Sequence, residues 1–350
     1  MRIFWVVLIP FCIWMFFYVI RRFFVIFGNN SKIIPLIIAI ILAIIVMWTF
    51  MYQWDSKILD IIWTISSRIF VLWFLLMIIL WIENIISIRY KVNPRIIVWI
   101  IIIILWLWTY FALHTKITNL TIETDKIEKD TKILLVSDIH TEHITSTYHI
   151  NKILKTIKTE KPDFVIIAWD LVNKPNNWYI NYFSIFKTIK NTPIFAVMWN
   201  HDVMWNTEII KKIPNISDIK LLNNESVEIY WIQLIWLTDK SLWGDQTIKD
   251  IMDNTNLNKD SGLFSILITH QPISLEKLND YPIDLEIAWH THQGQFYWIR
   301  KVVKWMNDYA YWEYKLWDRT AFVTQWIWTW WLPFRLWTQS EMVVINLIKK

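Results

Sequence analysis

The stretch "PIFAVMWNHD" at residues 193–202 decides the fold, because an apolar run ends there in a polar cluster. Its first part is a short, continuous apolar segment, which is typical of a strand buried on both faces. Asn200, His201 and Asp202 follow. These side chains at the end of a buried strand predict a metal-binding or catalytic turn. Trp199 and Trp205 flank this tight turn with the bulkiest side chain available, which is unexpected.

Four other segments repeat the arrangement of a buried strand followed by polar side chains. Two of them, "KILLVSD" (132–138) and "DFVIIAWD" (163–170), end in an acid. The other two, "LFSILITHQP" (263–272) and "DLEIAWHTHQGQ" (284–295), carry histidines. Helical periodicity at 149–161 and 178–190 separates the first strands, and residues 226–239 predict a hairpin. This alternation predicts a layered α/β domain with ligands bound at the carboxyl ends of the strands.

The predicted strand ends collect oxygen and nitrogen donors and no thiolate. The donors are Asp138, His140, Asp170, Asn200, His201, His270, His290 and His292. A single histidine at a strand end is more often structural, but five strand ends with such donors indicate a metal site. Carboxylates, a carboxamide and imidazoles suit Mn, Fe, Zn or similar ions.

Tryptophan is as abundant in this chain as glycine is in an ordinary protein. The sequence has 27 Trp and 4 Gly, whereas ordinary usage would give about 25 Gly. Our hypothesis is that most of these tryptophans stand where glycine belongs. Some bacterial lineages translate the codon UGA as glycine, and translation of such a gene with the wrong code table would print tryptophan at these positions. The alternative is a truly Trp-rich protein with Trp in core and membrane-belt positions. UGG codons at the suspect positions would support that alternative.

The motifs "SDIH", "WD", "WNHD", "THQP" and "WHTHQGQ" resemble the five motifs of the calcineurin-like metallophosphoesterases in order, spacing and strand context. That family has DxH, GD, GNHD, a lone His and GHTH, so Trp169, Trp199 and Trp289 each occupy a glycine position of the family. Glycine in such turns reaches positive φ and lets the backbone approach metal and substrate. The resemblance covers about residues 130–350. It implies an α/β metallophosphoesterase domain in which two mixed β-sheets are sandwiched between helices.

The resemblance also implies roles for the strand-end side chains. One divalent ion would be held by Asp138, His140 and His292, and a second by Asn200, His270 and His290, with Asp170 bridging the two. Two such ions clamp the phosphoryl oxygens and activate a water for in-line attack. His201 would be the general acid or transition-state stabiliser, oriented by Asp202. The alternative for His201 is a supporting role without proton transfer.

The sequence departs from the family pattern around two of the motifs. Thr141 and Glu142 follow the DxH histidine, where the family often has Leu-Gly, and Gln293 replaces a frequent Gly. His143 is either an extra substrate contact or a solvated loop residue. None of these departures removes a ligand, so the sequence predicts an active metal-dependent phosphoric ester hydrolase.

Residues 1–114 predict a four-helix transmembrane domain, and residues 115–350 the metallophosphoesterase domain. The apolar runs 3–20, 33–53, 58–81 and 96–113 are long enough to cross a bilayer core of roughly 30 Å. No small-residue cleavage site follows the first run, so a retained helix is favoured over a signal peptide. Lys and Arg are more frequent between runs one and two and between runs three and four. This bias predicts that the soluble domain faces outward from a bacterial cell membrane.

Two charged residues, Asp60 and Arg68, lie inside or near the third run. An intramembrane ion pair would mark a transport path. The favoured interpretation is an interfacial Asp and a paired or snorkelling Arg. The only cysteine, Cys12, excludes a disulfide within the chain.

Residues 311–347 resemble the glycine-rich end of the membrane-associated branch of the family. The match requires glycine at Trp312, Trp317, Trp326, Trp328, Trp331 and Trp337, while Trp330 fits as a true tryptophan. As printed, the tryptophan-rich part of this segment is alternatively an aromatic belt that meets the bilayer.

The expected partners are membrane lipids and a phosphate ester or pyrophosphate. The membrane domain favours a lipid-linked substrate, as in UDP-2,3-diacylglucosamine diphosphatase-type hydrolases. A net charge of +5 gives no argument for nucleic acid, and the sequence does not predict the oligomeric state. Two alternatives are a membrane sensor or interaction protein with an inactive metal-binding domain, and a transporter with a soluble regulatory domain.

Overall fold

The structure is a computed structural model of the 350-residue chain. It describes residues 2–51, 57–89, 93–137, 139, 146–168, 181–197, 211–238, 244, 246–289, 301, 303–305, 309–325 and 339–350. Contacts divide the chain into a helical unit, Met1–Tyr110, and an α/β unit that begins at Phe111.

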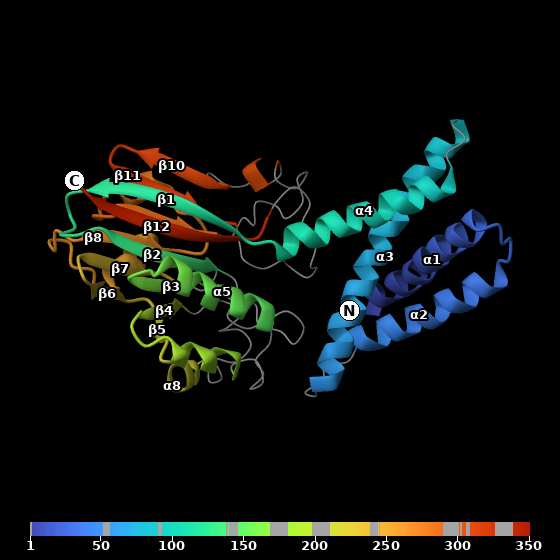
Figure 1. The fold of residues 1–350 in the computed structure, drawn as a ribbon, viewed down its shortest axis with the longest axis horizontal. Coiled ribbons are helices and arrows are strands. Elements are labelled where there is room, and N and C mark those ends of the chain that lie inside the picture. Colours follow the sequence, from blue (N-terminus) through green and yellow to red (C-terminus); the bar gives the residue numbers. More distant parts are fainter. Residues whose placement is uncertain are drawn as a thin grey trace. The chain divides into compact units, whose positions relative to one another are not determined.

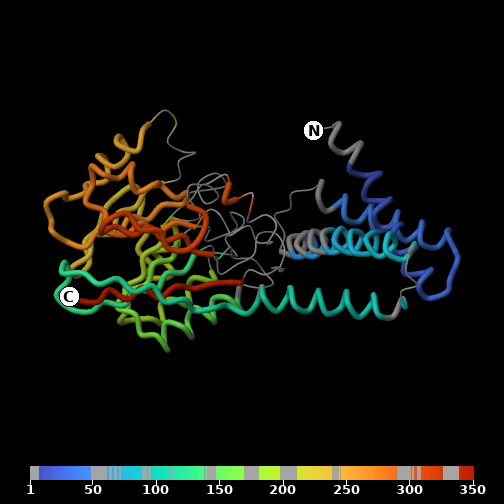
Figure 2. Tube along the Cα trace, turned by 90° about the horizontal axis from the view of Figure 1, so that it is seen from above, coloured from blue at the N-terminus to red at the C-terminus, as the bar shows by residue number. Residues whose placement is uncertain are grey.

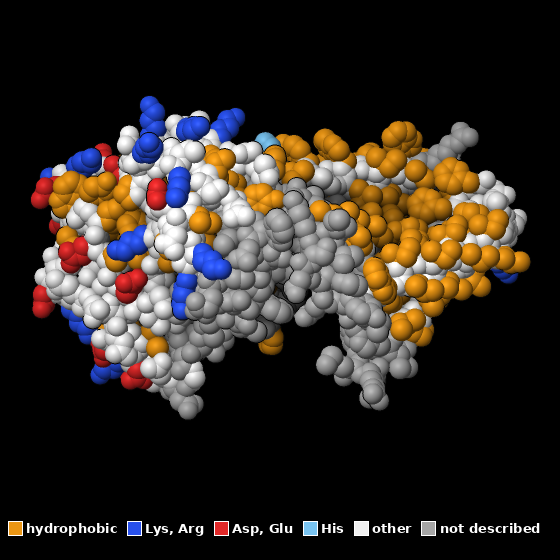
Figure 3. Space-filling view, turned by 90° about the horizontal axis from the view of Figure 1, so that it is seen from below, with side chains coloured by type: hydrophobic (Ala, Val, Ile, Leu, Met, Phe, Trp, Pro, Cys, Tyr) orange, Lys and Arg blue, Asp and Glu red, His pale blue; other side chains and the backbone are white. Residues whose placement is uncertain are grey.

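The helical unit is built from apolar helices. These are α1 (Arg2–Ile26), α2 (Ile33–Met51), α3 (Lys57–Arg89) and α4 (Pro94–Leu113), which are shown in Figure 1. Helices α1 and α2 pack through a buried cluster that includes Cys12, Met15 and Ala43, with partly buried side chains of α3 against it. Ile97 and Ile101 of α4 join Val19 and Leu80 in a second cluster. Many other apolar side chains of this unit are exposed (Figure 3).

One stretch of the described residues is long and apolar enough to cross a membrane. This stretch is Leu8–Ile26 in α1. The apolar stretches Ile33–Trp48, Leu72–Ile88 and Ile96–Phe111 are shorter. The four helices therefore agree with the expected runs, whereas the crossing of a membrane by all four stays a prediction.

Arg22 of α1 forms an ion pair with Glu83 of α3. The side chains of Arg22 and Glu83 are 20% and 10% exposed, so the pair is largely shielded from water. Arg21 and Arg22 lie between the apolar runs 3–20 and 33–53 and contribute to the Lys and Arg bias, but both belong to α1, which ends at Ile26. The side chains of Asp60 and Arg68 lie outside the described residues.

The α/β unit contains two six-stranded mixed sheets. The first has the order β1-β12-β2-β3-β4-β5. Its strands are β1 (Lys116–Thr124), β12 (Glu341–Lys349), β2 (Thr131–Ser137), β3 (Phe164–Ala168), β4 (Ile194–Val197) and β5 (Lys220–Leu222). Only the β12–β2 pair in this sheet is antiparallel. Strands β1 and β12, far apart in sequence, lie side by side (Figure 2).

The second sheet has the order β10-β11-β9-β8-β7-β6. Its strands are β10 (Trp312–Leu316), β11 (Arg319–Val323), β9 (Leu285–Ala288), β8 (Phe264–Ile268), β7 (Ile232–Trp236) and β6 (Ser226–Ile229). Strands β11, β9, β8 and β7 run parallel, and an antiparallel strand lies at each edge. Two mixed sheets are what the sequence predicted.

The main core lies between the two sheets. Side chains from both sheets form one buried cluster there, including Leu135, Ile166, Leu234, Ile266 and Ile287. Each fully buried aliphatic side chain of this kind stabilises the fold by about 1.5–3 kcal/mol. The strands β2, β3 and β8 are buried almost throughout, because core also lies on their other face.

Helices cover the outer face of each sheet. On the first sheet these are α5 (Ser146–Glu160), the 3₁₀ helix η1 (Asn181–Thr188) and α8 (Ile213–Ser217), which share a second cluster. On the second sheet α9 (Ile248–Asp253) and the 3₁₀ helix η3 (Leu275–Leu278) form a third. The predicted layered α/β architecture is therefore confirmed.

Each of the local predictions corresponds to a described element. The helix expected at 149–161 is α5, whose buried residues Ile150, Ile153 and Ile157 follow helical spacing. The hairpin expected at 226–239 is the β6–β7 pair. The helix expected at 178–190 is present in its described part, where it is the 3₁₀ helix η1 with Phe183 and Phe186 buried. These two aromatic side chains are three residues apart and lie on the same face of a helix with three residues per turn.

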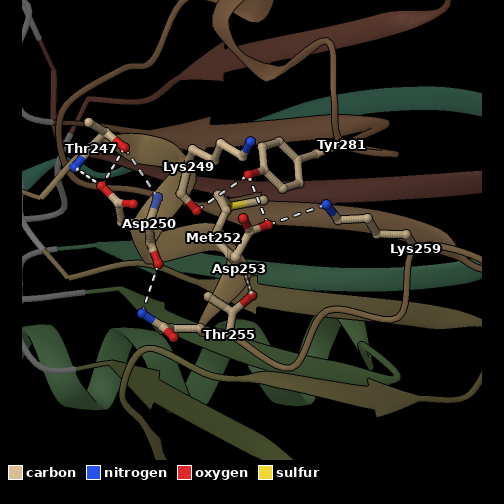
Figure 4. A network of polar contacts seen from close by, with 9 residues as sticks. Thr247, Lys249, Asp250, Met252, Asp253, Thr255, Lys259 and Tyr281 are labelled. Atoms are coloured by element: carbon tan, nitrogen blue, oxygen red, sulfur yellow. Dashed lines mark hydrogen bonds and ion pairs between the residues drawn. The ribbon is translucent and has the colours of Figure 1, made fainter.

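A polar network fixes α9 on the second sheet (Figure 4). Thr247 and Asp250 form a capping box at the start of the helix. At its end, the hydroxyl of Tyr281 donates to Asp253, and the ammonium of Lys259 lies 4.4 Å from the Tyr281 ring centroid. Burial and the Asp253 carboxylate raise the pKa of Tyr281 to about 12, so this hydroxyl stays a donor at neutral pH.

Candidate active site

The three motif-bearing strands of the first sheet end at one edge. Strands β2, β3 and β4 are parallel neighbours, in which Ser137 pairs with Ala168 and Ala168 pairs with Val197. Asp138, Asp170 and Asn200 follow these three strand ends by one, two and three residues. The structure therefore brings together the three strand ends that precede these predicted ligands.

The two motif-bearing strands of the second sheet also end together. Strands β8 and β9 are parallel neighbours, with Ile268 paired to Ile287. The pairing continues beyond them, because the amide of Trp289 donates to the carbonyl of His270 at 3.2 Å. His270 therefore lies beside the residue that directly precedes His290.

Glu341 joins the carboxyl edges of the two sheets. It begins β12, which runs antiparallel to β2, so it lies near the carboxyl end of β2. Its carboxylate accepts hydrogen bonds from the Thr324 hydroxyl at 3.0 Å and from the Gln325 amide at 2.9 Å. These residues follow β11, and the Thr324 amide donates to Ala288 at the end of β9. A third bond, from the Thr118 hydroxyl, fixes Glu341 to β1.

Glu341→Leu is expected to destabilise the α/β unit by about 3–5 kcal/mol, because it leaves three donors without their acceptor. Glu341 is 1% exposed, so water does not replace the lost acceptor. The measurement is denaturant unfolding of the purified chain, with Glu228→Leu on an exposed position of β6 as the control. A loss below about 1 kcal/mol would contradict the role of Glu341 as a bridge.

His270 is the predicted ligand whose side chain the structure describes. Its imidazole is buried, with 5% of the residue exposed. The Trp289 ring lies edge-on to it, with 6.0 Å between the centroids, and Trp236 stacks on Trp289 at 6.4 Å. The imidazole is thus held in an apolar wall at the edge where the strands end.

The other predicted site residues lie outside the described residues. They are Asp138, His140, Asp170, Asn200, His201, Asp202, His290 and His292. Accordingly, the described part of the chain holds no group of three His, Cys, Asp or Glu side chains suited to a metal. The donor chemistry nevertheless fits a divalent ion, since it combines carboxylates, a carboxamide and imidazoles, and the described imidazole is buried at the shared edge.

Glu286 is a buried acid near this edge that sequence reasoning missed. It lies within β9, is 0% exposed, and accepts hydrogen bonds from the Thr269 hydroxyl and the Ile273 amide. Burial raises the pKa of Glu286 to about 8, although the two hydrogen bonds oppose the rise. The available signal was an acid inside the otherwise apolar run "LEIA" of a parallel strand.

Glu286 predicts a pH dependence of stability in the metal-free protein. Its ordinary pKa of 4.5 rises to about 8 on folding, so between these values the folded chain keeps a proton that the unfolded chain releases. The contribution of Glu286 is fully present below pH 4.5 and is lost as the pH rises through about 8. We expect Glu286→Gln to gain stability over the parent across this window, on the order of 5 kcal/mol in total. Denaturant unfolding in the presence of a chelator, repeated across the pH range, measures this gain. If the unfolding free energies of Glu286→Gln and the parent change in parallel with pH, the prediction is contradicted.

Comparison with known proteins assigns the family. The calcineurin-like phosphoesterase family model matches residues 131–318, more than half of the chain, and the chain belongs to this family. Its α/β unit is thus a metallophosphoesterase domain, the class of metal-dependent phosphoester hydrolases. Members of this fold family generally bind divalent metal ions.

The relatives come from bacteria. The chain is 29% identical over 238 residues to a metallophosphoesterase of Helicobacter pylori strain J99, covering 67% of this chain and 64% of the relative. A metallophosphoesterase of Campylobacter jejuni is 26% identical over 242 residues, with the same coverage. Phosphodiesterase YaeI of Escherichia coli is 27% identical over 173 residues, covering 47% of this chain and 61% of the relative. The chain therefore spans less than two thirds of the length of these relatives.

Proposed function

We propose that the chain is a membrane-anchored phosphoesterase that uses two divalent metal ions to hydrolyse a phosphodiester, phosphomonoester or pyrophosphate. The observation that carries the proposal is the Glu341 bridge, which holds the carboxyl edges of the two sheets together. All five motif-bearing strands end at these edges. Membership of the calcineurin-like phosphoesterase family supports the same chemistry.

The proposed ligand sets follow the motifs. Asp138, His140 and His292 would hold one ion, Asn200, His270 and His290 would hold the other, and Asp170 would serve both. When bound, the two ions supply positive charge that stabilises the phosphoryl oxygens in the transition state. His201 would donate a proton to the leaving oxygen of the substrate or stabilise the transition state. Asp202 would orient the His201 ring.

We propose a lipid-linked substrate, similar to that of UDP-2,3-diacylglucosamine hydrolases. The support is the helical unit, whose exposed side chains include Ile37, Ile41, Ile44, Trp99 and Ile103. On the face seen in Figure 3, apolar side chains gather on this unit and charged ones on the α/β unit. Such helices would anchor the chain in a bacterial cell membrane, with the α/β unit outside the cytoplasm and next to lipid headgroups.

The proposed function predicts metal-dependent hydrolysis of a generic aryl phosphodiester by the purified native protein, with glycine at residues 169, 199 and 289. We expect turnover with Mn²⁺, loss of turnover with a chelator, and recovery when the ion is returned. A matched assay with a lipid diphosphate tests the substrate class. Absence of hydrolysis with Mn²⁺, Fe²⁺ and Zn²⁺ alike would refute the proposal.

We also propose that most of the 27 tryptophans are glycines in the native protein. Trp312 and Trp317 support this, because their φ values are 79° and 56°. A bulky residue rarely adopts positive φ, whereas glycine does so without strain. Trp317 is the first residue of the two-residue turn between β10 and β11, where some hairpin turns require glycine. Mass spectrometry of the native peptides that contain residues 199 and 317 tests the proposal, and tryptophan at both positions would refute it.

A second candidate function is a membrane sensor or interaction protein with an inactive metal-binding domain. The observation that favours it is Trp289, which is fully buried and lies against the His270 ring. If tryptophan is truly present at 169, 199 and 289, indole rings would occupy positions where this family has glycine. This candidate predicts a chain that folds but shows no turnover.

A further inference from the structure

The side chain of Glu286 faces the outer layer of the second sheet. Its neighbours in β9, Leu285 and Ile287, belong to the core between the sheets. Because side chains alternate along a strand, Glu286 points to the opposite face, which packs against α9 and η3. The carboxyl group is therefore enclosed by apolar side chains.

One oxygen of Glu286 contacts both ends of the loop that carries His270. The Oε1 atom accepts a hydrogen bond from the Thr269 hydroxyl at 3.0 Å and another from the Ile273 amide at 2.6 Å. His270, Gln271 and Pro272 lie between these two anchor points. Backbone bonds to β9 add to this attachment, since the Thr269 amide donates to the Ile287 carbonyl at 3.0 Å.

We propose that Glu286 is a positioning residue that holds the 269–273 loop so that the His270 imidazole is fixed for metal binding. The inference rests on the proposed function, in which His270 is a ligand. A loop held at both ends has lost most of its conformational freedom before the ion arrives, so binding does not bear that entropy cost. Outer hydrogen bonds of this kind typically change metal affinity by 10–100-fold.

Packing alone does not explain a carboxyl group at this position. The Oε2 atom has no hydrogen-bond partner among the described residues. Burial also opposes ionisation of this carboxyl group and raises its pKa. An apolar side chain would fill the same space without these penalties. What Glu286 supplies, and leucine cannot, is an acceptor between Thr269 and Ile273.

The proposal predicts different results for two variants of Glu286 whose side chains are of similar size. Glu286→Gln keeps an acceptor oxygen for Thr269 and Ile273, whereas Glu286→Leu removes it. Thr269→Val is a milder variant that removes one of the two hydrogen bonds. Met252→Ala is the matched control, because Met252 is fully buried in the same outer cluster but belongs to α9.

The test measures amide hydrogen exchange of the 269–273 peptide without metal, Mn²⁺ affinity by titration, and kcat and KM separately. We expect Glu286→Leu to speed exchange of this peptide and to weaken Mn²⁺ binding by about 10–100-fold. Thr269→Val should give a smaller change in the same direction. Glu286→Gln should remain within about threefold of the parent, and Met252→Ala should lower the melting temperature without changing exchange of this peptide.

Two results would overturn the positioning role. One is unchanged exchange and Mn²⁺ affinity in Glu286→Leu, and the other is an equal loss in Glu286→Gln and Glu286→Leu. Failure of the proposed function has a different signature, because the parent chain itself would then show no Mn²⁺ binding and no turnover. In that case hydrogen exchange alone still decides whether Glu286 holds the loop.

Discussion

His270→Ala is expected to lower kcat/KM for an aryl phosphodiester by about 10²–10³-fold. The substitution removes an imidazole that is buried at the edge where β8 and β9 end, and alanine offers no donor in its place. One ion would be lost or weakly held, and with it several kcal/mol of transition-state stabilisation. Initial rates at saturating and limiting Mn²⁺ measure the effect, with Asp170→Asn as an independent variant of equal expected severity.

The control for His270→Ala is another buried histidine. His149 is 1% exposed and lies on α5, in the outer layer of the first sheet. His149→Ala is expected to lower the melting temperature while metal content and kcat stay near those of the parent. Full turnover in His270→Ala would remove His270 from the ligand set, and full turnover in Asp170→Asn as well would refute the proposed two-metal site.

The second large effect is expected from the identity of residues 169, 199 and 289. A chain produced with tryptophan at these positions should bind fewer than two metal ions and show little turnover. The combined replacement Trp169→Gly, Trp199→Gly and Trp289→Gly should raise turnover by at least about 10²-fold, because glycine frees the space next to the ligands. Of these three tryptophans, the structure describes Trp289, whose ring centroid lies 6.0 Å from that of the His270 imidazole. Metal analysis and the phosphodiesterase assay measure both effects.

Trp305→Gly is the control for this replacement, since Trp305 is 86% exposed. It should change neither metal content nor turnover. Equal activity in the tryptophan and glycine chains would contradict the steric explanation of the motif positions. No turnover in either chain would instead favour the inactive sensor.

The sequence predicted those parts of the fold whose signal is local. Continuous apolar runs predicted β2, β3, β4, β8 and β9, because strands buried on both faces need them. The pairing of β1 with β12 was not predicted, because the two strands are more than two hundred residues apart and neither ends in a motif. The β10–β11 hairpin was also missed, since Trp317 occupies its turn and gives no turn signal.

The site was predicted from the order and spacing of its motifs rather than from side-chain contacts. In the structure the strands that precede the motifs end together at one edge of each sheet, and His270 lies at that edge of the second sheet. The positions of the other predicted ligands and of His201 and Asp202 stay predictions. Glu286 and Glu341 could not be assigned from the sequence, because their roles depend on hydrogen bonds to residues on other strands and loops.

The central claim is that the ends of five strands, distant in sequence, together hold a pair of cations. Electron paramagnetic resonance of the native protein, with glycine at residues 169, 199 and 289, loaded with Mn²⁺ tests it most directly, because two ions that share a bridging ligand are magnetically coupled. We predict two Mn²⁺ per chain with a coupled spectrum that His270→Ala reduces to that of a single ion. Two uncoupled ions, or a spectrum that His270→Ala leaves unchanged, would contradict the account.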